Sequence, residues 1–528
     1  MQKEFNDTGL CVPHLHYMAD TSKKIEQILR LVGKGKYFTI NRPRQFGKTT
    51  ILSLLAKHLN QQDDYLALKI SFEGIDRVTY ENYEQFICEF LMLLLKKTEL
   101  LNYPELSVFI EQNIGKTPNM PALSRFITSL VRHTEPQKSV VLLIDEVDKS
   151  SDNRLFLDFL GMLRDKYLQR NEGEDHTFHS VILAGVHDVK TLKAKIRPDD
   201  ERKYNSPWNI AADFTVDMSF SPEEIGVMLR EYSRDKGIQP DISAISERLY
   251  YYTSGYPFLV SKLCKFIDEH IAPMREDRNW RISDTDEAFR MIADESYTTT
   301  LFDSLIKNLE NNSELYDAVL NMVINGRTST FTVSDPVISQ GYLYGIISKG
   351  DDGRCRIHNR IYEQRIYAHM MSKLERSRYE DIGAPAGPEF FYNDTLNVKL
   401  VLQRFQTFMK EHYSDRDQKF LEREGRLLFL SFLRPIVNGK GFEFKEPNVS
   451  DERRMDIVIT LKSRRYVLEL KRWYGSKAHQ EGLNQLCNYL ETYSLKQGYL
   501  LIYDFRKNKT YKQEEIAVGD KRVFAVWI

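Results

Sequence analysis

The chain has little cysteine, and the cysteines that it has are scattered. There are five of them: Cys11, Cys88, Cys264, Cys355 and Cys487. No two of them form a C-x-x-C pair, and an odd number cannot all pair within one chain. This pattern argues against a disulfide framework and against a cysteine-rich zinc site.

Long apolar runs are missing as well. The stretch FLMLLL at 90–95 is among the longest, and it is far shorter than the roughly 18 residues that a membrane span needs. The N-terminal MQKEFNDTGLC has no apolar core of the kind that secretory signals contain. We therefore expect no membrane association and a cytoplasmic location.

The chain also has almost no net charge, with 74 Lys and Arg residues against 75 Asp and Glu residues. This balance favours no class of partner, although it can conceal a local basic patch. Hydrophobic residues make up 42% of the chain, which is typical of a globular protein and excludes a disordered one. At about 150 residues per domain, the length predicts three or four domains.

Strands and helices are expected to alternate over the first 215 residues. Branched apolar runs predict strands at 36–40, 67–74, 140–146 and 180–186, and helical patterns separate them. Such alternation indicates a parallel α/β sheet.

The pattern changes after residue 215. Four further segments are predicted: a helical unit over 216–297, a module over 298–380, a Pro/Gly-rich linker over 381–400 and a second α/β domain over 401–528. In the module, helices precede two short strands at 330–334 and 354–359, which is typical of a winged helix.

The segment RPRQFGKTT (42–50) lies between a predicted strand and a predicted helix. It fits the second half of G-x-x-x-x-G-K-[ST] through Gly47, Lys48 and Thr49, while Arg42 replaces the first glycine. Backbone N–H groups at a helix start bind phosphate, the lysine reaches the β- and γ-phosphates, and the hydroxyl ligates Mg²⁺. A surface loop that holds G-K-T by chance is the alternative.

The apolar strand VVLLIDEVD (140–148) delivers two carboxylates about a hundred residues later. Asp145 is expected to hold Mg²⁺ through water, and Glu146 to orient or deprotonate the attacking water. The alternative is a strand end with two solvated carboxylates. Asp148 is left open between a capping or salt-bridge role and a catalytic one.

These two motifs resemble those of bacterial AAA-ATPase-like proteins, in which they read RPRRFGKS and LIDEYDK. The resemblance covers about residues 10–215 and implies a P-loop NTPase domain over 1–215 that binds ATP and Mg²⁺. The nucleotide-binding residues that it implies are Arg44, Gln45, Phe46, Gly47, Lys48, Thr49, Thr50 and Asp145, with Thr49 and Asp145 as metal ligands.

Two further segments bear on this resemblance. SGYPFL (254–259) resembles a lid element of STAND-type signalling ATPases, although Gly255 and Pro257 are equally explained by a helix-start turn. In ILAGVHDVK (182–190), His187 follows a strand that usually ends in Asn, Ser or Thr, so the sequence does not predict fast hydrolysis. Arg197 and Arg202 are candidate arginine fingers.

A second group of charged residues lies near the C-terminus. Asp456 opens the strand MDIVIT, and Glu469 and Lys471 follow in YVLELKRW. Residues i and i+2 of a strand share a face, so Glu469 and Lys471 are expected to project together. With Asp456 on a neighbouring strand, they would bind a divalent metal and hydrolyse a phosphodiester. Carboxylate ligands suit Mg²⁺ or Mn²⁺, and a surface salt bridge is the alternative.

This pattern resembles that of PD-(D/E)XK nucleases. Glu424, in the helix predicted over 420–437, stands where that superfamily often carries a further acidic ligand, and Gln485 and Tyr489 match its Q-x-x-x-Y helix. The resemblance implies an α/β nuclease-like domain with catalytic residues Asp456, Glu469 and Lys471 and metal ligands Glu424, Asp456 and Glu469.

A basic stretch surrounds this pattern. Residues 462–477 contain six Lys or Arg and one acid, with Tyr466, Trp473 and Tyr474 interleaved. Such a stretch is suited to bind phosphates and stack on bases, but a solvated loop beside a sheet edge would look the same.

Taken together, the sequence predicts an ATP-binding protein, an ATPase, coupled to a Mg²⁺- or Mn²⁺-dependent nuclease that acts on nucleic acid, DNA before RNA. The alternative is a nucleotide-controlled switch or scaffold whose nuclease-like domain binds nucleic acid without cleaving it. Whether the chain forms a homo-oligomer is left open.

Overall fold

The computed structural model describes most of the chain. The described residues are 3–134, 137–147, 154–185, 208–294, 296–323, 328–378, 390–393, 395–412, 428–430, 432–433, 436–437, 442–447, 455–461, 464–492, 494–506 and 509–528. Five candidates lie outside them: Asp148, His187, Arg197, Arg202 and Glu424. Among the helices that are described, none has the length and apolarity to cross a membrane.

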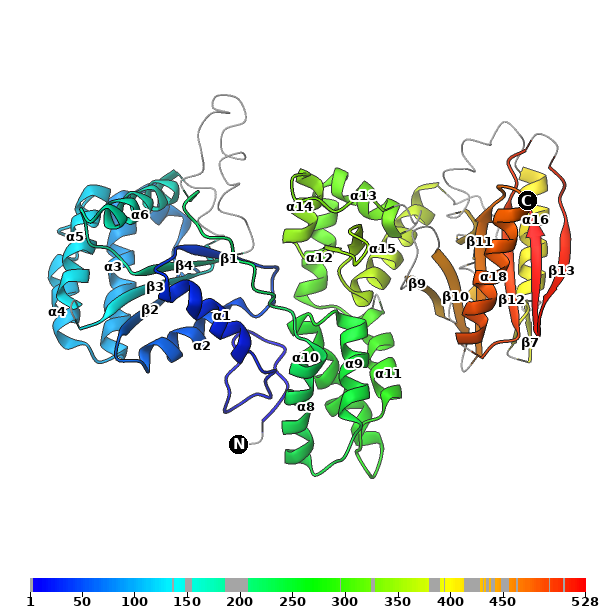
Figure 1. Ribbon diagram of the computed structural model, residues 1–528, viewed down its shortest axis with the longest axis horizontal. Coiled ribbons are helices and arrows are strands. Elements are labelled where there is room, and N and C mark those ends of the chain that lie inside the picture. The colour runs from blue at the N-terminus through cyan, green and yellow to red at the C-terminus, as the bar shows by residue number, and fades with distance from the viewer. Residues whose placement is uncertain are drawn as a thin grey trace.

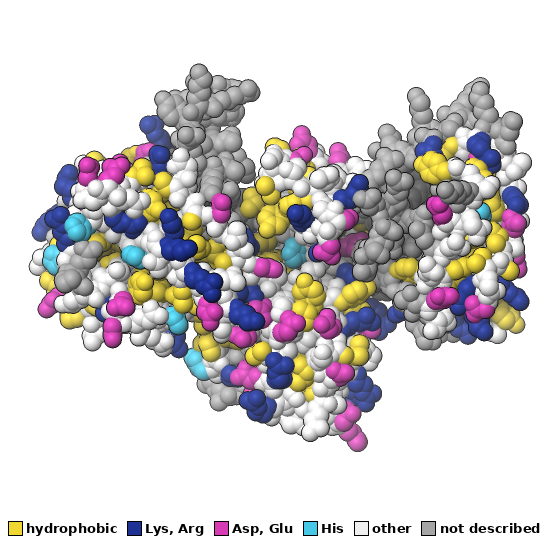
Figure 2. All heavy atoms as spheres, viewed as in Figure 1, with side chains coloured by type: hydrophobic (Ala, Val, Ile, Leu, Met, Phe, Trp, Pro, Cys, Tyr) yellow, Lys and Arg dark blue, Asp and Glu magenta, His cyan; other side chains and the backbone are white. Residues whose placement is uncertain are grey.

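Three parts follow one another along the molecule (Figure 1). An α/β domain forms one end, two helical modules lie in the middle, and a second sheet forms the other end. Figure 2 shows acidic and basic side chains mixed over the visible face, in line with the balanced composition.

The first domain is built on the expected parallel sheet. Its strands are β1 (Phe38–Asn41), β2 (Tyr65–Ser71), β3 (Ser139–Asp145) and β4 (Ser180–Gly185), in the order β1-β4-β3-β2. Every pairing is parallel. The four predicted strands are therefore confirmed, and β4 separates the strands that lead into the two motifs.

Helices cover both faces of this sheet. They are α1 (Ser22–Gly33), α2 (Lys48–Asn60), α3 (Tyr83–Leu100), α4 (Pro104–Asn113), α5 (Met120–Thr134) and α6 (Arg154–Glu172), with a 3₁₀ turn at Arg77–Glu81. Successive residues of a strand point to opposite faces. Accordingly, Ala67 packs in the core that includes α1 and α2, while Leu66 and Leu68 pack in the core of α3–α6.

The predicted helical unit over 216–297 consists of helices in its described part. They are α8 (Pro222–Lys236), α9 (Ile242–Thr253), α10 (Pro257–Phe266) and α11 (Ile282–Ala293). A π turn at Ile267–Ile271 and a 3₁₀ turn at Ala272–Met274 continue α10. Helix α8 starts with a capping box, in which the Ser221 side chain accepts from Glu224 N–H and the Glu224 side chain accepts from Ser221 N–H.

The next module departs from the expected strands. It contains α12 (Thr300–Glu310), α13 (Ser313–Val323), α14 (Pro336–Leu343), β5 (Ile347–Lys349), β6 (Cys355–Ile357) and α15 (Arg360–Arg378). Strand β6 falls within the predicted 354–359, but its partner is β5, so the prediction at 330–334 was wrong. There only Thr330 forms a bridge, because Thr332 closes a turn and Asp335 caps α14.

The C-terminal part is a six-stranded mixed sheet in the order β13-β14-β12-β11-β10-β9. Its strands are β9 (Phe442–Pro447), β10 (Met455–Leu461), β11 (Arg464–Arg472), β12 (Gln497–Tyr503), β13 (Gln513–Val518) and β14 (Lys521–Trp527). Helix α18 (Ser476–Thr492) connects the parallel pair β11 and β12. The predicted strands at Asp456 and Glu469 are confirmed.

The linker predicted over 381–400 is folded wherever the structure describes it. Strands β7 (Phe391–Tyr392) and β8 (Thr395–Leu396) pair with each other, and helix α16 (Val398–His412) starts soon after them. Phe390 and Leu396 are buried in the core, and the Tyr466 hydroxyl accepts a hydrogen bond from Leu396 N–H. Apolar burial thus extends the C-terminal fold into the predicted linker. Of the helix predicted over 420–437, the described residues are helical and buried.

Candidate nucleotide site and a second acid–lysine centre

The segment 42–50 connects β1 to α2, as the sequence predicts. Gly47 caps α2 with φ of 80°, a left-handed conformation that favours glycine. Arg42, in place of the usual glycine, points its guanidinium away from the loop: it donates to the Val216 carbonyl at 2.7 Å and lies over the Phe214 ring. The replacement therefore anchors the loop to the segment after the sheet.

Lys48 lies at the centre of this loop. Its side chain is buried, with 6% of the residue exposed, and its Nζ donates to the carbonyl oxygens of Arg42 and Pro43, each at 2.9 Å. A buried ammonium needs such acceptors. The lysine thus folds back onto its own loop, and a bound phosphate would compete with these two carbonyls.

The remaining loop residues face different neighbours. Arg44 and Gln45 are exposed, and Gln45 has φ of 55°. Thr49 lies in the first turn of α2, while the Thr50 hydroxyl accepts a hydrogen bond from the backbone N–H of Cys11. Thr50 is therefore engaged by the N-terminal segment.

The two carboxylates of the second motif lie at the C-terminal end of β3. Asp145 is 2% exposed, and its Oδ1 accepts from the backbone N–H of Glu146 at 3.1 Å. Glu146 has φ of 56°, a strained backbone for a residue other than glycine and one that clusters at functional sites. Lys69 of β2, which the sequence analysis did not single out, brings its Nζ to 3.8 Å from Asp145 Oδ2.

The start of α10 packs against the phosphate loop. The hydroxyl of Tyr256 donates to the Arg44 carbonyl, and its ring meets the Phe46 ring edge-on with centroids 4.7 Å apart. A Cβ built on Gly47 would lie 4.0 Å from Cγ of Pro257. The segment 254–259 therefore reaches the phosphate loop, and Pro257 starts α10, as the alternative of a helix-start turn expects.

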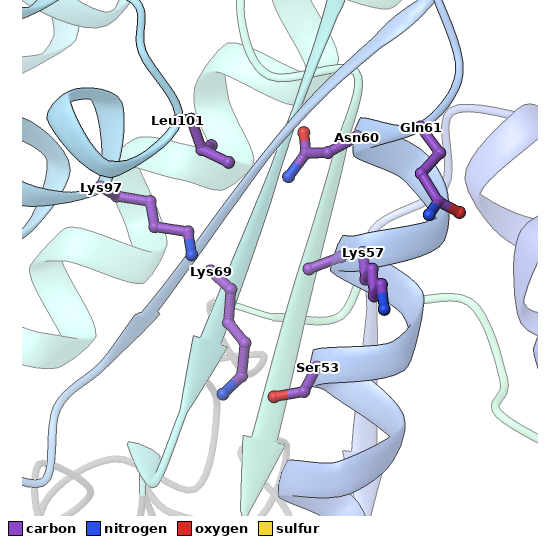
Figure 3. Close-up of a pocket in the computed structure, with 8 residues that line it drawn as sticks. Ser53, Lys57, Asn60, Gln61, Lys69, Lys97 and Leu101 are labelled. Carbon is purple, nitrogen blue, oxygen red and sulfur yellow. The ribbon is translucent and has the colours of Figure 1, made fainter. Parts of the chain in front are cut away.

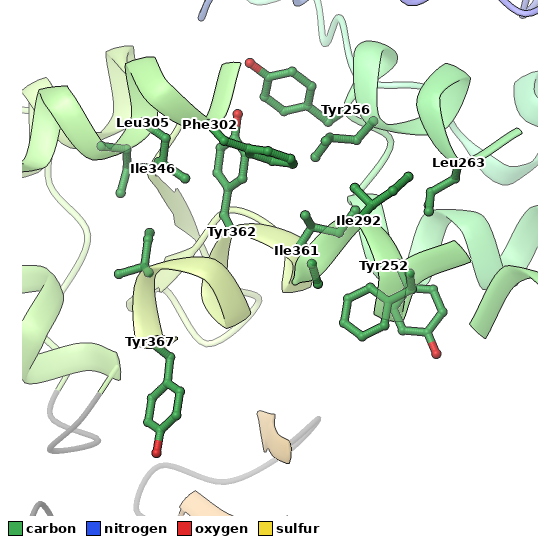
Figure 4. Packing of buried hydrophobic residues seen from close by; sticks show 14 of the residues in the cluster. Tyr252, Tyr256, Leu263, Ile292, Phe302, Leu305, Ile346, Ile361, Tyr362 and Tyr367 are labelled. Carbon is green, nitrogen blue, oxygen red and sulfur yellow. The ribbon is translucent and has the colours of Figure 1, made fainter. Parts of the chain in front are cut away.

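The module over 298–380 touches the same loop. The half-buried His358 ring lies 5.9 Å from Phe46 and 5.6 Å from Tyr256, and desolvation by the surrounding groups lowers the His358 pKa to about 4, so this imidazole is neutral near pH 7. Gly345 approaches Pro43 so closely that a Cβ there would lie 2.5 Å from Pro43 Cγ. Figure 4 shows Tyr256 near Phe302 and Tyr362 of this module.

The C-terminal acid–lysine pair is buried. Glu469 is 2% exposed, and Lys471 Nζ lies 3.2 Å from Glu469 Oε1. The two side chains share a face of β11, as expected, and they form a salt bridge that is largely buried and not on the surface. A Cβ on Gly482 of α18 would lie only 1.4 Å from Lys471 Nζ. Gly482, which the sequence analysis missed, thus makes room for the ammonium.

The pairing of β10 with β11 places the backbone of Asp456 next to that of Glu469. Ile457 pairs with Leu468, so Asp456 and Glu469 are the next residues of the two antiparallel strands. The side chains of Asp456 and Gln485 lie outside the described part, whereas Tyr489 packs on the core beneath α18. Within the described residues, no group of three or more His, Cys, Asp and Glu could hold a metal ion.

Aromatic side chains adjoin Lys471. The His479 ring lies 5.4 Å from Trp473 and 5.6 Å from Trp527, and burial together with the Lys471 charge lowers the His479 pKa. In the predicted basic stretch, Tyr474 is 73% exposed and Arg472 lies over its ring. Arg472 follows Lys471 on β11 and therefore points to the opposite face of the sheet, so the basic stretch is divided between the two faces.

Comparison with known proteins assigns the first two thirds of the chain. Residues 15–364 match the family model described as an AAA-like domain. An uncharacterised WD repeat-containing protein of Synechocystis is 23% identical over 372 residues, which is 66% of this chain. The chain spans only 28% of the length of that relative.

Solved structures resemble the same part at low identity. A Walker-type ATPase of Pyrococcus abyssi has a TM-score of 0.45 at 12% identity and covers 69% of this chain and 99% of its own. The ORC2 protein of Aeropyrum pernix, in ADPNP and ADP complexes, has a TM-score of 0.38 at 12% identity, with 69% and 98% covered. The RuvB branch migration motor of Thermotoga maritima has a TM-score of 0.33 at 14% identity, with 66% and 94% covered.

Proposed function

The chain belongs to the AAA-like domain family, and we propose from this that the α/β domain and the two helical modules after it bind ATP with Mg²⁺ and hydrolyse it. The observation that carries the proposal is the strand–loop–helix unit with a left-handed Gly47 and a buried Lys48, near a strand that ends in Asp145. Thr49 and Asp145 offer a hydroxyl and a carboxylate oxygen, a donor set that suits Mg²⁺. Bound Mg²⁺ would neutralise charge on the phosphates.

The residues of this site would have separate roles in ATP binding and hydrolysis. Lys48 would leave the carbonyls of Arg42 and Pro43 and pair with phosphate, which is a charged and therefore stronger acceptor. Backbone N–H groups at the start of α2 would hold the same phosphates. Glu146 would orient the attacking water or accept its proton.

We further propose that the nucleotide controls the contact between the winged-helix module and the phosphate loop. Pro43 abuts Gly345, and Phe46 packs against Tyr256 and His358. A loop that rearranges around phosphate must change these contacts. This observation favours a nucleotide-controlled switch as the second candidate function, with the ATPase setting how long each state lasts.

For the C-terminal domain we propose a metal-dependent nuclease with Asp456, Glu469 and Lys471 as catalytic residues. It is supported by the buried acid–lysine pair and by the strand register that brings Asp456 next to Glu469. Asp456, Glu469 and Glu424 would hold Mg²⁺ or Mn²⁺, and Lys471 would stabilise charge on the scissile phosphate. The alternative remains a domain that binds nucleic acid, DNA in the first place, without cleaving it.

Replacing Lys48 by Ala is expected to weaken ATP binding by at least about 100-fold, because the charge that faces the phosphates is lost. Glu146→Gln should bind ATP normally but hydrolyse it about 100-fold more slowly. Calorimetry and phosphate release measure the two effects, with the exposed Lys34→Ala as control. Unchanged ATP affinity in the Lys48 variant would refute the site.

Gly345→Ala should push the winged-helix module off the phosphate loop, because the new methyl collides with Pro43. If this contact restrains the loop, ATP affinity should rise about fivefold or more. Gly353→Ala is a matched control: Gly353 lies in the same module with φ of 76°, but nothing lies within 4 Å of its Cβ position. Equal ATP affinities in the two variants would contradict the switch.

Asp456→Asn and Glu469→Gln should each abolish cleavage of plasmid DNA with Mg²⁺ or Mn²⁺. Lys471→Ala should slow it by about 10²–10³-fold while sparing metal binding. Gly482→Ala should also slow cleavage, since it displaces the Lys471 ammonium and leaves both carboxylates in place. The exposed Glu481→Gln on the same helix serves as the control.

Cleavage that survives in the Asp456 variant would place the activity elsewhere. Wild-type protein that cleaves neither DNA nor RNA, with or without ATP, yet binds them would favour the binding-only alternative. Thermal unfolding of each variant distinguishes loss of activity from loss of the fold, because a buried charge left without its partner is destabilising.

A further inference from the structure

A cavity of about 340 Å³ lies in the first domain, beside the phosphate-loop helix rather than at its start (Figure 3). It opens between α2 and α3 over β2, the edge strand of the sheet. The residues that line it are Ser53, Ala56, Lys57, Asn60, Gln61, Lys69, Lys97 and Leu101. Its size falls at the lower end of the range for small-molecule pockets, roughly 300–1,000 Å³.

Lysines from three separate elements meet in this cavity. Lys57 comes from α2, Lys69 from β2 and Lys97 from α3, and Figure 3 shows Lys69 and Lys97 extending into the same space as Ser53. None of the eight lining residues, all of them in the described part of the chain, is acidic. The lining therefore combines lysines and neutral polar groups with the apolar side chains of Ala56 and Leu101.

Bringing these cations together is electrostatically unfavourable. Lys97 is half-buried, and its pKa is lowered by that burial and by the charge of Lys69. The acid that Lys69 approaches, Asp145, lies 3.8 Å away and is not part of the lining. A bound anion would add a counter-charge inside the cavity and would relieve the repulsion between the two lysines.

The wall of the cavity is held in place by backbone contacts. The Asn60 side chain donates to the carbonyl of Ala67 at 3.0 Å and accepts from its N–H at 2.7 Å, which joins the end of α2 to β2. The cavity is thus framed by a helix and a strand fixed to each other, and not by a loop. Ser53, one turn beyond Thr49, adds a hydroxyl donor.

We propose that this cavity is a second anion site, which binds a small free polyanion of the phosphate class such as a pyrophosphate or phosphorylated metabolite. Its three ammonium groups would neutralise the phosphate charges, and Ser53 and Gln61 would add hydrogen bonds. A concave site of this volume suits a small molecule, whereas the backbone of a long nucleic acid needs an open groove.

Pyrophosphate titrated calorimetrically into the full-length Lys48→Ala protein tests the proposal, because the phosphate loop is disabled in that background. Binding is expected, and adding Lys97→Met or Lys57→Met should weaken it at least tenfold. Lys96→Met, at an exposed position next to Lys97 on α3, should leave it unchanged. All three methionine replacements keep an unbranched side chain as far as the ε position and remove the ammonium group.

Absence of pyrophosphate binding in the Lys48→Ala protein would overturn the proposal. Equal losses of pyrophosphate affinity in the Lys97 and Lys96 variants would overturn it as well. The proposal would also be overturned if a single-stranded oligonucleotide bound in a Lys97-dependent manner and pyrophosphate did not bind. Wild-type protein that fails to bind ATP while its Lys97-dependent pyrophosphate binding persists would refute the proposed nucleotide site and leave this one standing.

Discussion

The shape of the phosphate loop depends on where the ammonium of Lys48 finds its hydrogen-bond acceptors. In this structure they are the carbonyl oxygens of Arg42 and Pro43, which belong to the loop itself. The loop is thus closed on a buried charge that cannot be left without partners. Because Pro43 also abuts Gly345, the loop conformation that satisfies Lys48 is the one against which the module over 298–380 packs. Hydrogen bonding inside the loop and packing outside it are therefore linked.

The C-terminal domain buries a charged pair in a different way. Removing Glu469 and Lys471 from water costs free energy that their mutual attraction offsets only in part, so such a pair is a poor device for stability. Its position is nevertheless specific, since α18 carries glycine at position 482, where any side chain would meet the ammonium. Glycine at position 482 leaves α18 without a packing side chain but makes room for the Lys471 ammonium. The proposed catalytic role of Glu469 and Lys471 explains this better than a role in folding does. The neighbouring backbone position of Asp456 fits the same explanation.

Much of this arrangement could be predicted from the sequence because it is local. Branched apolar runs identify β1 to β4, and the i, i+2 spacing places Glu469 and Lys471 on one face of β11. Three-residue β5 is too short for such a pattern, and β-branched residues at 330–334 imitate a strand where Asp335 instead caps a helix. The contacts of Phe46 with Tyr256 and His358 join residues more than 200 positions apart, and only the packed fold brings them together.

These long-range contacts also explain why the proposed nucleotide response would be a switch rather than a graded movement. The groups that meet at Phe46 are the Tyr256 ring and a His358 imidazole that is neutral because desolvation lowers its pKa to about 4. Contacts of this kind depend on close packing and lose about a quarter to a half of their attraction once the surfaces separate by about 0.5–1 Å. Charged contacts, by contrast, weaken gradually with distance. In the proposed switch, the module over 298–380 would therefore either fit the loop or leave it, which is the property that a two-state element requires.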